Sequence, residues 1–148
     1  ISRLLDRVSV DVIQFHGDET PAFCRQFSRP WIKALRVKPD MDIPSLSARY
    51  DGARAILLDA WQEGIPGGTG KRFDWSLVPT SLGRPMVLAG GLDERNVWAA
   101  VSALCPDAVD VSGGVESSPG IKDAGKIAGF VAAVKAAEQG VKAQTDDH

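Results

Sequence analysis

Side chains that move protons stand directly after short apolar runs of this chain. His16 follows "DVIQF", and Asp59 ends "AILLD". An aspartate at the end of a buried run serves either as a general acid or as a cap for the following turn, and its position alone does not decide between the two. A single histidine is weak evidence for proton transfer, so we interpret His16 as part of the wall of a binding site.

Two glycine-rich turns also follow apolar runs. Gly90 and Gly91 come after "MVLA", and Ser112, Gly113 and Gly114 come after "AVDV". Glycine lets backbone N–H groups approach an anion closely, and a helix that begins near Glu94 would direct its positive end to the same place. Together the two turns predict a phosphate site, although one glycine pair alone would be only a helix-entry turn.

The elements that must position these residues alternate strictly between strand and helix. The apolar runs are nearly continuous, as in a parallel sheet that is covered on both faces, and this predicts the α/β class. Thr20 and Asp93 are candidate helix caps, and the segment 112–123 has room for a short extra helix. The expected strands are 11–15, 32–37, 55–59, 86–90 and 108–112, and the expected helices are 1–8, 21–27, 43–50, 94–104 and 122–137, with a short turn at 74–77.

Charge and cysteine content argue against several classes of partner and ligand. The 148 residues carry a net charge of -2 and no basic cluster, which argues against nucleic acid and anionic membranes as partners. Cys24 and Cys105 form no metal-binding motif, are expected to be small buried side chains, and fit a reducing cytoplasm. We expect one domain over 1–138 and a frayed tail over 139–148.

The loop after Asp59 is the longest connection between strands. The third and fourth expected strands start 31 positions apart (55 to 86), against 21 to 23 for the other pairs. A connection of this length is often a lid, so "GIPGGTGKRF" is expected to close over a ligand and exclude water. Trp61, beside the acid, is a candidate to border the ligand. The "GGTGK" run lacks the spacing of a nucleotide-binding loop.

The ordered motifs resemble phosphoribosylanthranilate isomerase, a (β/α)8 TIM-barrel enzyme of tryptophan biosynthesis. The resemblance covers almost the whole chain and rests on "DVIQFHGDE", "IKALRV", "LLDA" with "GGTGKRFDW", "LAGGLDERNV" and "VDVSGGVESSPGIKD". It implies that the chain covers about the last five βα units of the barrel.

The family resemblance implies a reaction and roles for named residues. The reaction is the Amadori rearrangement of N-(5-phosphoribosyl)anthranilate to 1-(2-carboxyphenylamino)-1-deoxyribulose 5-phosphate, without a metal or organic cofactor. Asp59 matches the general acid that protonates the furanose ring oxygen. The turns at Gly90–Gly91 and Ser112–Gly114 match the phosphate loops, with Gly113 where the family usually has a second serine. The resemblance also implies a cytoplasmic enzyme that is a monomer or homodimer when complete.

The family's general base is a cysteine in a Lys-Ile-Cys-Gly motif that this sequence does not contain. The chain by itself is therefore expected to be inactive. Two alternatives stay open: a non-catalytic fragment that binds phosphosugars, and another phosphate-binding barrel such as indole-glycerol-phosphate synthase.

Overall fold

The computed structural model describes residues 1–59 and 75–145, with side chains to residue 141. Its main sheet has five parallel strands in the order β1-β2-β3-β4-β5. All five expected strands are confirmed, with slightly different ends. They are β1 (Ile13–Phe15), β2 (Trp31–Arg36), β3 (Ile56–Asp59), β4 (Met86–Ala89) and β5 (Ala108–Val109).

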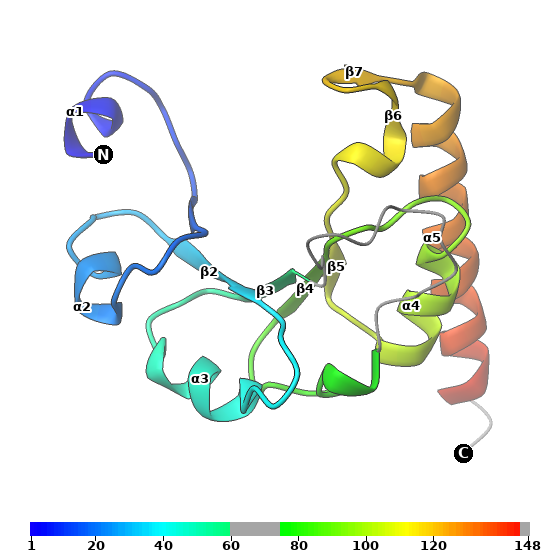
Figure 1. Cartoon of the computed structure of the whole chain (residues 1–148), viewed down its shortest axis with the longest axis horizontal. Coiled ribbons are helices and arrows are strands. Elements are labelled where there is room, and N and C mark those ends of the chain that lie inside the picture. The colour runs from blue at the N-terminus through cyan, green and yellow to red at the C-terminus, as the bar shows by residue number, and fades with distance from the viewer. Residues whose placement is uncertain (60–74, 146–148) are drawn as a thin grey trace.

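Helices α2 (Pro21–Cys24), α3 (Ile43–Arg49) and α4 (Val97–Leu104) each connect two successive strands, and α5 (Ala124–Thr145) follows the sheet (Figure 1). Figure 1 shows α2 and α3 beside the first strands, and α4 and α5 together at the far end of the sheet. A short hairpin of β6 and β7, which the sequence did not predict, precedes α5. The elements are α1 (Ser2–Leu5), α2 (Pro21–Cys24), α3 (Ile43–Arg49), the 3-10 turn η1 (Trp75–Leu77), α4 (Val97–Leu104), the 3-10 turn η2 (Gly113–Val115), β6 (Glu116–Ser118), β7 (Ile121–Lys122) and α5 (Ala124–Thr145).

The expected helix starts are supported by capping side chains. Thr20 accepts a hydrogen bond from the Phe23 N–H at 3.2 Å, and Pro21 opens α2. Asp42 caps α3 in the same way through the Ser45 N–H. The short extra helix expected within 112–123 is a single 3-10 turn, η2.

Several helix limits differ from the expectation. The first helix stops at Leu5, and Ile1, Leu4 and Val8, the apolar residues of the longer helix expected over 1–8, are exposed. Helix α2 ends at Cys24 instead of residue 27. Helix α5 continues past Gly140 to Thr145, because a glycine in a long helix lowers stability without ending it.

The two faces of the sheet are built differently. One face, which we call the outer face, carries large residues such as Trp31, Ile56 and Leu88, which pack with the helices in one core. We call the opposite face the inner face. The inner face carries a separate small cluster of Ala34, Leu57 and Ala89 with Val87. Strands in sequential order with their helices packed on one face are the arrangement of a β/α barrel, whereas a doubly wound sheet places helices on both faces. No helix in the described part of the chain is long and apolar enough to cross a bilayer.

We expect Leu58→Ala to destabilise the fold by about 2 to 5 kcal/mol, because Leu58 is completely buried in the outer core and truncation leaves a cavity. Leu4→Ala is the matched control, since 57% of Leu4 is exposed on α1. Urea unfolding of both variants measures the difference. An equal effect of the two substitutions would contradict the packing described here.

Candidate functional site

The carboxyl ends of the five strands lie along one edge of the sheet, which we call the carboxyl edge (the ends of β1 to β5). Parallel pairing places Asp59 beside Arg36 on one side and Ala89 on the other. His16 follows β1 directly, and Gly90 follows Ala89. The candidate residues that the sequence scatters over a hundred positions therefore gather at this edge.

His16 and Asp59 form a direct pair. The His16 Nε2 atom lies 3.2 Å from Asp59 Oδ2, although β2 separates their strands. Residues alternate between the faces of a strand, so Asp59 shares the inner face with Leu57, and His16 shares it with Gln14. The Asp59 side chain is 17% exposed and that of His16 is 40% exposed. The pair thus offers a shielded carboxylate with a hydrogen-bonded imidazole at the mouth of the sheet.

The two glycine turns touch each other. Gly90 and Gly91 have φ of 89° and 64°, a conformation that favours glycine. Gly114 packs so tightly against the other turn that a β-carbon there would overlap the Leu92 carbonyl oxygen and lie 2.9 Å from the Leu92 carbonyl carbon. The expected proximity of the two turns is confirmed, and the contact depends on the absence of a side chain at Gly114.

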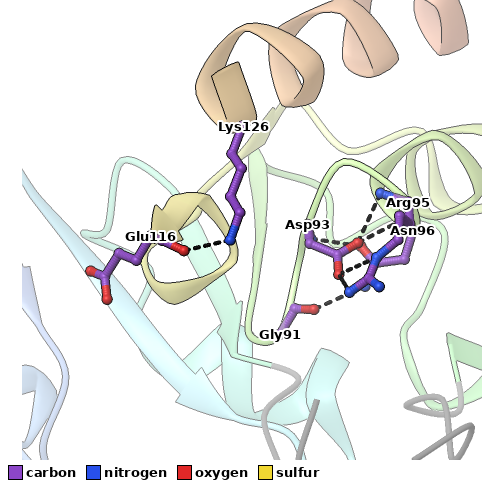
Figure 2. A network of polar contacts seen from close by, with 6 residues as sticks. All are labelled: Gly91, Asp93, Arg95, Asn96, Glu116 and Lys126. Carbon is purple, nitrogen blue, oxygen red and sulfur yellow. Dashed lines mark hydrogen bonds and ion pairs between the residues drawn. The ribbon is translucent and has the colours of Figure 1, made fainter. Parts of the chain in front are cut away.

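Asp93 fixes the first turn, as Figure 2 shows. One carboxylate oxygen accepts hydrogen bonds from the N–H groups of Arg95 and Asn96, and the other accepts from the Arg95 guanidinium at 2.7 Å. The Asn96 side chain in turn donates to the Gly91 carbonyl at 2.9 Å. The sequence predicted that Asp93 caps the helix itself, but it caps the turn formed by residues 94–96. The regular helix starts only at Val97, with Asn96 at its N-cap position and no capping side-chain hydrogen bond.

The charge of Asp93 is stabilised by these contacts. Desolvation of the carboxylate acts to raise its pKa, but the hydrogen bonds and positive charge of Arg95, with the backbone donors, outweigh it and hold the pKa below the ordinary value.

Two lysines brace the second turn. Lys122 Nζ donates to the Ser112 carbonyl at 3.0 Å and to Glu116 Oε1 at 2.7 Å. Lys126, at the start of α5, donates to the Glu116 carbonyl at 2.6 Å (Figure 2). The hydrogen bond from Lys122, followed by that from the Gly120 N–H, lowers the pKa of Glu116. Neither lysine was predicted from the sequence, because their roles depend on the hairpin that folds the chain back.

A third lysine lies behind the site and was also missed. Lys33 is buried on the outer face and forms an ion pair with Glu19 at 3.0 Å. Desolvation acts to raise the pKa of Glu19, yet the hydrogen bond and charge of Lys33, together with backbone donors, keep it below the ordinary value. The alternation of the strand contains the signal: Trp31, Lys33 and Leu35 share one face, so a lysine stands where an apolar residue is expected.

The sequence also made predictions for the two cysteines, for Trp61 and for a lid. Cys24 is buried as expected, whereas Cys105 is exposed because it caps α4 in a left-handed conformation with φ of 45°. Trp61 and the expected lid at 64–73 lie outside the described residues. No group of three potential metal ligands occurs within 1–59 and 75–145.

The fold and the carboxyl-edge site place the chain in the class of parallel β/α barrel proteins, and comparison with known proteins names the family. The model of the N-(5'-phosphoribosyl)anthranilate isomerase family matches residues 1–133. A curated isomerase of that name from Pseudomonas putida strain F1 is 57% identical over 137 residues, covering 93% of this chain and 66% of the relative. This chain therefore belongs to the N-(5'-phosphoribosyl)anthranilate isomerase family, and it spans slightly less than two thirds of the length of that relative.

Solved structures agree with this assignment. The phosphoribosyl anthranilate isomerase of Thermotoga maritima is 37% identical with a TM-score of 0.78, covering 91% of this chain and 68% of that one. Another such isomerase, crystallised in complex with reduced 1-(o-carboxyphenylamino)-1-deoxyribulose 5-phosphate, is 34% identical with a TM-score of 0.74, covering 91% of this chain and 66% of that one.

We expect Gly114→Ala to destabilise the protein by about 1 to 3 kcal/mol, because the added methyl group collides with the Leu92 carbonyl. Gly113→Ala is the control, since a β-carbon at Gly113 meets no atom within 4 Å. Urea unfolding compares the two. A Gly114→Ala variant as stable as Gly113→Ala would show that the turns do not touch.

Asp93 should support stability in a pH-dependent way. Its folded-state pKa lies below the ordinary value of 3.8, so its charge stabilises the fold above that pH and loses its effect as the pH falls through the folded-state pKa. Asp93→Asn keeps the capping oxygen and removes the charge. We expect it to cost about 1 kcal/mol at neutral pH and progressively less on acidification.

Urea unfolding from neutral pH down to about pH 3 follows this difference. Asp6→Asn, at an exposed position directly after α1, controls for the loss of one negative charge. A pH-independent cost of Asp93→Asn would contradict the proposed charge effect.

Proposed function

We propose that this chain carries the general-acid and phosphate-binding parts of an N-(5'-phosphoribosyl)anthranilate isomerase. The observation that carries the proposal is the position of Asp59, paired with His16 and aligned with Ala89, the residue directly before the Gly90–Gly91 turn. A ligand phosphate on the glycine turns would bring its sugar to the carboxylate. Membership of the family supports the same reaction.

In this proposal each group has a separate task. Protonated Asp59 donates its proton to the furanose ring oxygen, the C1–O bond breaks, and the ring opens to a Schiff base on the anthranilate nitrogen. His16 contacts the Asp59 carboxyl group and orients it. The backbone of Gly90, Gly91, Ser112, Gly113 and Gly114 holds the phosphate and so fixes the sugar. The general base that removes the C2 proton is a cysteine of the family motif, which this chain does not contain.

The complex of the related isomerase supports the substrate class. Its ligand combines a carboxyphenylamino group with a deoxyribulose 5-phosphate. We propose that Trp61 borders the aromatic ring of the corresponding substrate here. The alternative hypothesis is a non-catalytic fragment that binds phosphosugars. It predicts that the protein binds inorganic phosphate but shows no turnover.

We also propose the cellular setting and assembly that go with this activity. Residues 1–138 would form part of a (β/α)8 barrel domain in a cytoplasmic enzyme of tryptophan biosynthesis. The complete enzyme would be a monomer or a homodimer. The curated relative from Pseudomonas putida is an N-(5'-phosphoribosyl)anthranilate isomerase, and one related Thermotoga maritima enzyme is described as dimeric.

The activity is tested in a chimera in which this chain replaces the aligned 137 residues of the Pseudomonas putida relative. The chimera should convert N-(5-phosphoribosyl)anthranilate to the deoxyribulose product, measured by chromatography. Asp59→Asn should lower kcat by about 10² to 10⁴-fold, because the amide cannot supply the proton.

Asp6→Asn is the matched control, because it makes the same chemical change at an exposed position directly after α1 and should leave kcat unaltered. Full activity of the Asp59→Asn chimera would exclude Asp59 as the acid. A folded chimera that binds phosphate but shows no turnover would favour the non-catalytic alternative.

A further inference from the structure

Lys33 is a buried charge in an apolar layer. Only 2% of it is exposed, and its strand neighbours on the outer face are Trp31 and Leu35. Removing an ammonium group from water is costly unless its donors are satisfied, and replacing a buried ion pair by apolar residues is often neutral or stabilising. Stability alone therefore gives no reason for a lysine at this position.

The Lys33 ammonium group instead binds three groups of one loop, residues 15–19. Its Nζ atom donates to the carbonyls of Phe15 and Gly17 and to Glu19 Oε2. The two carbonyls belong to the residues immediately before and after His16. Three donors on one atom can satisfy all three acceptors, which no apolar side chain and no single hydroxyl can do.

The same loop is held by further contacts. Glu19 Oε2 also accepts from the Gly17 N–H at 2.9 Å, and the Tyr50 hydroxyl donates to the Glu19 carbonyl at 3.0 Å. The Tyr50 ring centroid lies 5.6 Å from Lys33 Nζ, within the range of a cation–π contact. The backbone on both sides of His16 is thus fixed from the outer face, while its imidazole meets Asp59 on the other.

We propose that Lys33 is a positioning residue that sets the His16 imidazole against Asp59. The catalytic meaning of this role rests on the proposed function, but the positioning itself is a property of this chain. Without Lys33 the loop loses the group that joins Phe15, Gly17 and Glu19, and the imidazole is no longer held beside the carboxylate.

The test uses NMR of the imidazole Cε1–Hε1 signals in this chain, which contains only two histidines, His16 and His148. Asp59→Asn should shift the His16 signal in the otherwise unaltered chain. In a Lys33→Met background, the shift caused by Asp59→Asn should be at least threefold smaller. A Lys33→Met variant that keeps the unaltered response would overturn the proposal.

Two further variants provide a control at Glu19 and a second substitution at Lys33. Glu19→Gln retains an oxygen that can accept from Lys33 and Gly17, so the response of His16 should be preserved. Lys33→Gln, a neutral polar replacement, serves if Lys33→Met does not fold, and it should also weaken the response at least threefold. Loss of the response in Glu19→Gln but not in the Lys33 variants would assign the positioning to Glu19 and overturn the proposal for Lys33.

The NMR test of Lys33 does not depend on whether the chimera is active. A weakened His16 response together with an active Asp59→Asn chimera would uphold the positioning role and reject the proposed general acid. An unaltered response together with an inactive Asp59→Asn chimera would reject the positioning role and leave the proposed function in place.

Discussion

Parallel pairing of the five strands is the constraint on which the site depends. Strands β1 to β4 bury large side chains in the core with the helices, and a slip of one residue would move these side chains to the inner face. The register that satisfies this burial aligns Arg36, Asp59 and Ala89 in one row. Asp59 and the Gly90–Gly91 turn therefore become neighbours as a consequence of packing on the opposite face.

Polar side chains hold the loops at the carboxyl edge, in addition to the apolar residues Leu92 and Val115, which belong to the buried core. Lys33 and Asp93 each join two backbone groups of one loop, and Lys122 joins the Ser112 carbonyl to the Glu116 side chain. These bonds are directional, so they specify the positions of backbone groups more closely than apolar packing could. The small inner cluster of Ala34, Leu57 and Ala89 leaves the charged groups of the edge on a face with few large side chains.

The sequence predicted the five strands well because each is a short apolar run between turn residues, and this signal is strongest in β3 and β4 because these strands bury residues on both faces. It placed Asp59 and the glycine turns at one edge for the same reason. It was wrong about the end of α2 and about the end of α5. Local helix signals determine such ends poorly, because packing against neighbouring elements extends or shortens the last turns.

By itself, the sequence determined the α/β class, the positions of the strands along the chain and the identity of the residues that follow them. Hydrophobic periodicity and the positions of glycines are local features of the chain, so they can be seen without the fold. Only the tertiary structure decided which of these residues touch. The His16–Asp59 pair spans an intervening strand, Gly114 meets Leu92 across two turns, and Lys33 joins a loop from the far face of the sheet. Each contact joins segments distant along the chain, and its geometry is fixed by strand register and helix packing, which no local pattern contains.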